Sequence, residues 1–452
     1  AAAERALALD PMHFMGGYEK VQALGQAGGE WEKQWAAVMR AEPQNYLELA
    51  TAYGAAGLYA DAETVLARAP AHPMVSYVRG YYREMAGDKG AAQRFYGEGA
   101  RGAVNYVNPH RLEELSALEA TLHYTRRDAH AHLFLGNLLY AKGRREEGFA
   151  HWREAVTIDP GLWQAWRNVA YAERFLKKDL RAAYATYRKT LEVNPGDARA
   201  LLEMDQAAEQ LRMSPAERFA VLNRHPDTVG QRDDLTARLA DLQLKAGDPD
   251  NLKLAHQVLG SHHFHSWEGR YGIHESWVEV NQRLGDLAFV RRDYAAALKH
   301  YQQACEYPKN LEVAPRTPDL RAHVFWNLAK VHLALGQKDA AEGYLNRILS
   351  EKYGRPHLGT FYQALAEKAR GNGARYRALL DEIEKRAREL TSGQFEYRGN
   401  QQAIGHYLLA RVLEERGTAG AAQEQEKALA LNLEAPRLAL RDAQLDYARA
   451  HQ

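Results

Sequence analysis

The chain has 452 residues, more than one compact hydrophobic core organises, so several domains or a repeat array are expected. Its 59 Lys and Arg nearly balance its 58 Asp and Glu, and no long block of one charge appears, so no nucleic-acid partner is expected. The single cysteine excludes an intrachain disulfide framework and a multi-thiolate metal site, and no apolar run is long enough to predict a membrane span.

The chain begins AAAERALALDP, with neither an initiator methionine nor a signal-peptide pattern. We expect a processed product or a piece of a longer chain. The location would be extracellular if processing removed the methionine, and cytoplasmic otherwise. Leu7 and Leu9, followed by the stop at Asp10-Pro11, predict the second helix of a helix pair.

Repeated helix pairs follow along the chain. One unit is YLELATAYGAAGLYADAETVLARAP at 46–70, and two complete units occupy 130–197 with a period of about 34 residues. In the first of these two units, Gly136 and Gly148 fall where two antiparallel helices must approach closely, and Trp152 fills the space beside them. Gly143 ends the first helix, and Pro160 stops the second.

The same pattern returns at 281–308 and 325–349, and more weakly at 406–432. Its spacing resembles that of tetratricopeptide (TPR) repeats over nearly the whole chain. The resemblance implies an all-α TPR α-solenoid, a right-handed superhelix of antiparallel helix pairs whose first helices line a concave groove.

We therefore predict one continuous array of roughly ten helix pairs over 1–452. Its parts are N-terminal repeats (1–128), two regular units (129–196), degenerate repeats ending in a long loop (197–274), two further regular units (275–350), and C-terminal repeats with an unpaired last helix (351–452).

Several polar and aromatic residues fall on first helices at a groove-facing phase. Two asparagines one repeat apart are typical of TPR grooves that bind a peptide carboxylate, but Leu133 stands where such a clamp needs a lysine. Ordinary polar groove residues are the simpler interpretation. The candidate groove contacts are Asn137, Tyr140, Arg167, Asn168, Tyr171 and Trp326.

The stretch HHFHSWEGRYG at 262–272 interrupts the repeats. We expect a long loop between helices, anchored by its aromatic residues and with polar side chains that satisfy its backbone. Two alternatives are a glycan or other ligand contact and a zinc site completed by Glu268 or His274. The candidate ligand residues are His263, His265, Trp267 and Glu268.

The motif FHSWEG, followed by the repeat that ends in YPKNL, resembles a family of bacterial proteins in which a carbohydrate-associated β-sandwich precedes a TPR array. Arg270-Tyr271 and Glu312-Val313-Ala314 depart from that family's pattern, and nothing here corresponds to the β-sandwich. The resemblance implies, as an alternative function, the helical part of a carbohydrate-active or glycan-binding protein.

The sequence contains no phosphate-binding loop, nucleophile elbow or His-Glu-x-x-His helix. We therefore expect no catalytic residue, cofactor or metal, and predict a non-enzymatic scaffold whose partners are proteins or peptides.

The two ends carry complementary half-repeats. The final stretch from Pro436 reads as a first helix without a partner, so the last helix of one molecule would complete a repeat with the first helix of the next. Such head-to-tail contact predicts a homo-oligomer or filament. The alternatives are a chain cut from a longer array and an ordinary capping helix. The residues expected at the junction are Leu7, Leu9, Leu438, Leu440, Leu445 and Tyr447.

Overall fold

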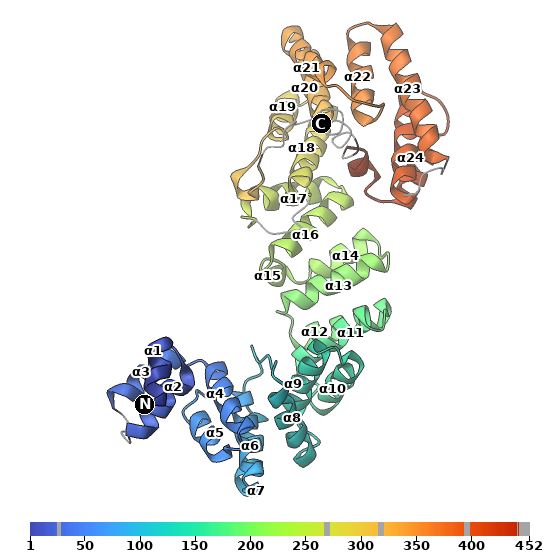
Figure 1. Ribbon diagram of the computed structural model, residues 1–452. Coiled ribbons are helices and arrows are strands. Elements are labelled where there is room, and N and C mark those ends of the chain that lie inside the picture. The colour runs from blue at the N-terminus through green and yellow to red at the C-terminus, as the bar shows by residue number, and fades with distance from the viewer. Residues whose placement is uncertain (25–28, 266–271, 315–320, 393–397, 441, 443–452) are drawn as a thin grey trace. The chain divides into compact units, whose positions relative to one another are not determined.

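A computed structural model describes residues 1–24, 29–265, 272–314, 321–392, 398–440 and 442 (Figure 1). Within these ranges the chain forms twenty-five α-helices and one 3-10 helix, with no β-strand. The helices fall into two compact units, Ala1–Met213 and Ser214–Gln452. The predicted all-α fold of antiparallel helix pairs is confirmed. The prediction that these pairs form one continuous array, with the repeat boundaries given above, stays a prediction.

Unit 1 contains the helices α1 Ala2–Leu9, α2 Phe14–Leu24, α3 Glu30–Met39, α4 Pro43–Ala55, α5 Tyr59–Leu66, α6 Pro73–Met85, α7 Lys89–Gly99, α8 Leu112–Tyr124, α9 Ala129–Ala141, α10 Arg145–Ile158, α11 Trp163–Phe175, α12 Leu180–Val193 and α13 Ala198–Gln210. Neighbours pack as pairs: α4 with α5, α6 with α7, α9 with α10, and α11 with α12. Each pair also contacts the next one. Between the α6–α7 and α9–α10 pairs this contact runs through the single helix α8, which packs against α6 and α9. These helices therefore form a stack of helical hairpins.

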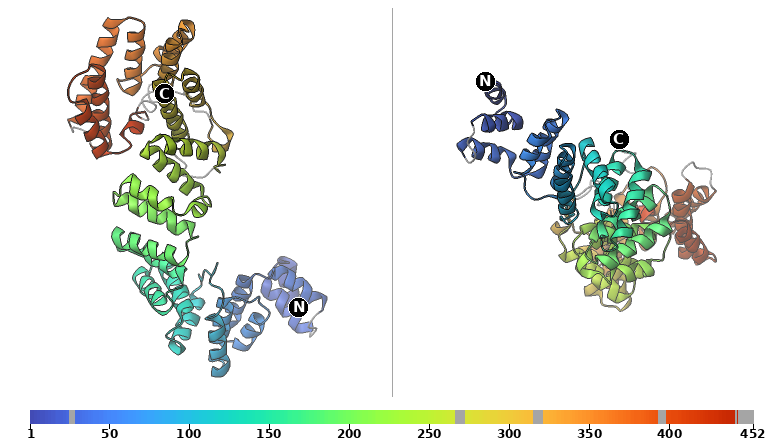
Figure 2. Two further views of the ribbon diagram at one scale, coloured as in Figure 1. Left: turned by 180° about the vertical axis from the view of Figure 1, so that it is seen from behind. Right: turned by 90° about the horizontal axis from the view of Figure 1, so that it is seen from below.

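Unit 2 contains α14 Pro215–Leu222, α15 Pro226–Val229, α16 Asp233–Ala246, α17 Pro249–Ser261, α18 Ile273–Val290, α19 Tyr294–Gln303, the 3-10 helix η1 Lys309–Leu311, α20 Ala322–Ala334, α21 Lys338–Ser350, α22 Leu358–Ala369, α23 Gly373–Thr391, α24 Arg398–Glu415 and α25 Ala421–Leu431. The five pairs from α16–α17 to α24–α25 repeat the hairpin arrangement. Figure 2 shows the same ribbon from behind and from below.

The small residues predicted at helix crossings do lie at close contacts. A Cβ added to Gly136 of α9 would lie 2.5 Å from the Trp152 ring of α10, and one added to Gly148 would lie 2.7 Å from the Gly136 carbonyl oxygen. The next crossing uses Ala170 and Ala183, both fully buried. Close backbone approach therefore explains the small residues, and the large ring beside them fills the remaining space.

The stops between helices also match the sequence. Gly143 follows α9 with φ of +88°, a left-handed conformation that favours glycine, and Asp159-Pro160 follows the last residue of α10. The close helix crossing described for Gly136 and Trp152 also recurs in unit 2. A Cβ on Gly285 of α18 would lie 2.4 Å from the fully buried Tyr301 ring of α19.

Within residues 74–128, the departure from the regular repeat lies in the connections and not in the first helix pair. A Cβ on Gly80 of α6 would lie 2.5 Å from the Tyr96 ring of α7, which is the same crossing as in the regular repeats. The departure follows α7, where residues 100–111 connect to α8 without helix. That connection becomes part of a groove.

Candidate functional site

Unit 1 contains a groove of about 710 Å³. Its walls come from α9, α11 and α13 and from the connection 100–111. The structure places five of the predicted groove contacts in this lining: Asn137, Tyr140, Arg167, Asn168 and Tyr171. These side chains come from the first helices of two consecutive pairs, which is the face that the repeat pattern predicts for ligand contact.

Hydrogen bonds fix the two asparagines of this groove. The Asn137 Oδ1 atom accepts a hydrogen bond from Trp152 Nε1 at 2.9 Å and a second from Asn168 Nδ2 at 2.8 Å. The Tyr140 ring stacks on the Trp152 ring, with centroids 4.8 Å apart, and meets the Tyr171 ring edge-on at 6.1 Å. Because the core holds these side chains in one arrangement, little conformational entropy remains to be lost when a ligand binds.

Both arginines of the groove are paired with carboxylates. Arg167 Nη1 lies 3.3 Å from Asp197 Oδ2, and Arg199 Nε lies 2.9 Å from Glu203 Oε1. Leu133, at the position where a carboxylate clamp needs a lysine, lies in the lining and is buried. The groove therefore presents amides, rings and neutralised charges, which suit an uncharged peptide stretch better than a free carboxylate.

Sequence reasoning did not identify Tyr106 as a groove residue. It lies in the connection 100–111, lines the groove, and is 97% exposed with φ of +62°. A hydrogen bond from Gln164 Nε2 to Asn105 Oδ1, 2.9 Å long, holds the preceding residue against α11. The only sequence signal is a tyrosine between two Val-Asn pairs in a segment without helical periodicity.

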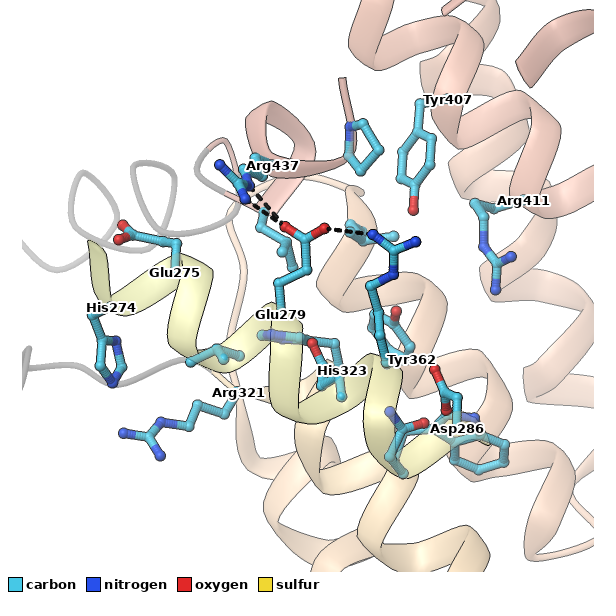
Figure 3. A pocket seen from close by; sticks show the side chains of 18 of the residues that line it. His274, Glu275, Glu279, Asp286, Arg321, His323, Tyr362, Tyr407, Arg411 and Arg437 are labelled. Carbon is cyan, nitrogen blue, oxygen red and sulfur yellow. Dashed lines mark hydrogen bonds and ion pairs between the residues drawn. The ribbon is translucent and has the colours of Figure 1, made fainter. Parts of the chain in front are cut away.

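Unit 2 contains a second groove, about 420 Å³ in volume, between α18, α20, α22 and α24 (Figure 3). The predicted contact Trp326 lies in its lining, together with Lys330, Tyr362 and Tyr407. Burial raises the pKa values of both tyrosine hydroxyls, so they remain protonated donors at neutral pH. Trp326 lines a groove of unit 2, whereas the other five predicted contacts belong to unit 1.

This second groove is lined by both acidic and basic side chains. Lys330 lies 4.0 Å from Asp286, and burial lowers the lysine pKa, an effect that Asp286 opposes and Arg411 reinforces. Two turns earlier on the same helix, Glu279 pairs with Arg283 at 3.6 Å and with Arg437 at 2.8 Å. The groove is therefore polar, with its acidic groups on α18 and a cation on α20.

The C-terminal segment, defined here as residues 434–440 and 442, lies along the groove of unit 2. Residues 435–440 and 442 are helical, and Pro436, Arg437 and Leu440 line the cavity. Leu438 and Leu440 pack against the apolar core formed by α22, α23 and α24. This corrects the expectation that these two leucines form an open stacking face, because their partners are in the same chain.

The other residues predicted at a head-to-tail junction are at the opposite end or outside the described residues. Leu9 is 89% exposed, Leu7 is half-buried, and α1 has no buried residue. Leu445 and Tyr447 lie outside the residues that the structure describes. A contact through the exposed side of α1 stays a prediction.

The described part of HHFHSWEGRYG is held as an anchored loop. Phe264 is fully buried, and its backbone N–H donates to the Asn310 carbonyl at 2.8 Å. Asn310 Nδ2 donates in turn to the carbonyls of Leu259 and His262, each at 2.8 Å. The two motifs that carry the resemblance in this region, FHSWEG and YPKNL, therefore stabilise each other. Trp267 and Glu268 lie outside the described residues.

Two histidines of this loop, His262 and His265, share Asp233 as a partner, and His263 contacts Glu312. His265 Nδ1 lies 3.0 Å from Asp233, and His263 Nε2 lies 3.1 Å from Glu312. His274 faces the Glu306 carbonyl at 3.0 Å and stacks on Tyr307. Among the described residues, no group of three or more His, Cys, Asp or Glu side chains is arranged to hold a metal ion.

No helix in the described part of the chain is both long and apolar enough to cross a membrane. No protein-family model matches the chain. Its fold is similar to that of several solved structures, although at low identity and low TM-score.

The C-terminal part of a TPR repeat-containing protein from Cytophaga hutchinsonii aligns over 59% of this chain and 98% of its own length, at 12% identity and a TM-score of 0.31. PilF of Pseudomonas aeruginosa aligns over 57% and 100%, at 17% identity and 0.27. A Naa15/Naa10 complex bound to HypK-THB aligns over 81% and 65%, at 15% identity and 0.37. Because these scores are low, the TPR-type assignment rests on the chain's own helix pairs.

Proposed function

We propose that this protein is a non-enzymatic scaffold that binds segments of other proteins in grooves lined by its first helices. The observation that supports this most directly is in unit 2, where a groove accommodates a helical segment of the same chain through Arg437 and Leu440. A groove that receives one helical segment has the dimensions and the chemistry to receive another.

The groove of unit 1 supports the same proposal with different chemistry. It offers the Asn137–Asn168 amide pair, the rings of Tyr140 and Tyr171, and the exposed Tyr106 ring. Preorganised amides hydrogen-bond a peptide backbone, and aromatic rings supply contact area at a small entropic cost. An uncharged extended or irregular peptide is the partner that this groove favours.

Selection of peptides from a random display library against the full chain tests the proposal. Binders are then measured against Tyr106→Ala and Tyr171→Ala, with Trp31→Ala as the control for an exposed aromatic residue of unit 1 that does not line the groove. We expect about a tenfold loss of affinity in either groove variant and no loss in the control, since central aromatic contacts dominate such interfaces. Repeated failure to select any binder, or binders insensitive to both groove variants and to changes in the groove of unit 2, would refute the proposal.

End-to-end assembly is a second, finer proposal, and the exposed α1 is the feature that favours it. Leu9 is almost fully exposed at the end of a helix without buried residues. Because Leu438 and Leu440 pack within their own chain, assembly through them requires release of the C-terminal segment. Sedimentation velocity of the full chain, alone and as Leu9→Glu, tests this: polymers that disappear in the variant support assembly, and a concentration-independent monomer contradicts it.

The glycan-binding alternative draws no support from the described residues. Phe264 is buried, and the His265 ring and backbone N–H both contact Asp233. These contacts favour a structural role for Phe264 and His265, the two described residues of FHSWEG.

A further inference from the structure

The C-terminal segment is anchored in the groove of unit 2 by one arginine. Arg437 Nε donates to Glu279 of α18 at 2.8 Å, and its Nη1 donates to Asp241 of α16 at 2.6 Å. The arginine side chain is 16% exposed, which makes it the least exposed member of the cluster, and Glu434 lies 3.4 Å from it within the segment itself. A guanidinium bound by three carboxylates at this depth is a specific anchor and not an incidental surface ion pair.

The receptor side of this anchor carries two carboxylates and two cations. Besides Arg437, the charged neighbours of Asp241 and Glu279 are Lys245, 2.8 Å from Asp241, and Arg283, 3.6 Å from Glu279. Lys245 also pairs with Glu434 of the segment at 2.7 Å. Burial alone raises the pKa of Asp241, but Arg437 and then Lys245 outweigh it, so the net pKa is lowered and the carboxylate stays ionised. Each of the two carboxylates thus has a cation partner on the receptor side and also accepts a hydrogen bond from Arg437.

Apolar and acidic contacts complete the fit. Ala435 and Ala439 of the segment are fully or almost fully buried, and Leu438 and Leu440 pack against the core of α22, α23 and α24. At the far end, buried Asp442 lies 3.1 Å from Arg355. The occupant thus presents one arginine, small residues and leucines on a short helix.

The segment does not fill the groove. A cavity of about 420 Å³ remains between it and the first helices, bordered on the segment side by Pro436, Arg437 and Leu440. Figure 3 shows Arg437 reaching Glu279 from one side, while Tyr407 and Arg411 stand on the other. Because Pro436, Arg437 and Leu440 border unfilled space, the segment is less completely packed than a helix sealed on all sides, although its Ala435 and Ala439 are buried.

We propose that the C-terminal segment is the resident occupant of a binding site for amphipathic helices that carry an arginine, and that a partner protein enters by replacing it. The partner supplies an arginine in place of Arg437, with a leucine or similar residue three positions later in place of Leu440. This deepens the proposed function and rests on it for unit 2 only. Because an intramolecular occupant competes at a high effective concentration, the site is closed to weak partners and open to strong ones.

The test measures fluorescence anisotropy of a labelled synthetic peptide with the sequence of residues 432–442 against the full chain. In Arg437→Glu the anchor is reversed to a charge that Asp241 and Glu279 repel, so the groove opens. We expect the peptide to bind this variant about tenfold or more tightly than it binds the wild-type chain. A peptide with glutamate at the position of Arg437 should lose that binding. Arg375→Glu, an exposed arginine of α23, is the matched control and should behave as wild type.

If the circular dichroism spectrum shows that Arg437→Glu disturbs the fold, the same peptide titration is made with Arg437→Gln, which removes the charge without reversing it. Equal peptide affinities for wild type and both variants would overturn the proposal. A wild-type dimer that dissociates in Arg437→Glu would also overturn it, because the occupant would then be a second copy of the chain. Either failure leaves the proposed function testable through Tyr106 and Tyr171 in unit 1, so the two are distinguishable.

Discussion

Gly136→Ala places the first heavy side-chain atom at the crossing of α9 and α10, directly behind the groove of unit 1. The added Cβ would lie 2.5 Å from Trp152 Cδ1, 2.6 Å from Trp152 Nε1 and 2.9 Å from the Gly148 carbonyl oxygen. The first two contacts require the indole to move, which disturbs the hydrogen bond from its Nε1 to Asn137 Oδ1. The third involves backbone, which yields only if the helices separate.

The expected cost follows from these contacts. Overpacking of this kind costs about 1–3 kcal/mol, and a weakened buried hydrogen bond adds about 1 kcal/mol. Alanine in place of a helical glycine returns about 1 kcal/mol through helix propensity. The net loss in the free energy of unfolding is therefore about 2 kcal/mol, or about 4–8 °C in the melting midpoint of a unit of this size.

Gly97→Ala is the matched control, because Gly97 also lies in a helix of unit 1 and a Cβ there would meet only the flexible end of Arg101 at 3.5 Å. It should gain about 0.5–1 kcal/mol from helix propensity. Thermal unfolding followed by circular dichroism compares the two variants with the wild type. A Gly136→Ala chain as stable as Gly97→Ala would refute the close-crossing account of the repeat.

Two further measurements test charged and titratable groups of unit 1. Buried Glu63 accepts hydrogen bonds from Arg79 at 2.6 Å and from Arg83 at 2.7 Å, so Glu63→Ala should cost about 2–3 kcal/mol in urea unfolding; a loss below about 0.5 kcal/mol would show that the pairing is dispensable. His151 Nδ1 lies 2.8 Å from His132 Nδ1, and burial followed by the like charge of His132 lowers the His151 pKa below 6.5. The unfolded chain therefore takes up this proton first, and the stability present above about pH 6.5 falls as the pH drops through the lowered pKa. The melting midpoint should fall less between about pH 7.5 and about pH 5.5 in His151→Gln than in the wild type, and identical pH profiles would contradict this.

The repeat architecture was predictable because its determinants are local. Gly136, Gly148 and Trp152 occur at fixed spacing within one hairpin, and each records a contact between helices adjacent in sequence. The same spacing predicted which residues of first helices line a groove, and Asn137 and Tyr171 do lie in one. Periodicity carries such information without knowledge of distant contacts.

Contacts between distant segments were not predictable in the same way. Arg437 meets Asp241 and Glu279, which precede it by 196 and 158 residues, and no local pattern specifies that pairing. Ala435, Leu438 and Ala439 have the i, i+3, i+4 spacing of an amphipathic helix, which indicates an apolar face but not which surface covers it. The sequence signal available was a single arginine within an otherwise apolar run, APRLAL.

The loop at 262–265 is a second case in which distant partners could not be predicted from the local sequence. His263 and His265 have a spacing that suits metal ligands, yet Glu312 and Asp233 from different elements engage them separately. Asn310, whose backbone carbonyl accepts the hydrogen bond from the Phe264 N–H, lies 46 residues along the chain, in the motif YPKNL. A composition rich in histidine therefore did not distinguish a ligand site from a loop that needs polar partners.

Hydrogen–deuterium exchange of the full chain, free and saturated with a selected peptide or a partner protein, tests the central claim most directly. Binding in the groove of unit 1 predicts added protection on α9, α11 and α13 and in residues 100–111. Binding in the groove of unit 2 predicts added protection on α18, α20, α22 and α24, with faster exchange in the C-terminal segment. Protection confined to second helices such as α10, α12, α19 and α21 would contradict it, because the partner would then bind outside both grooves.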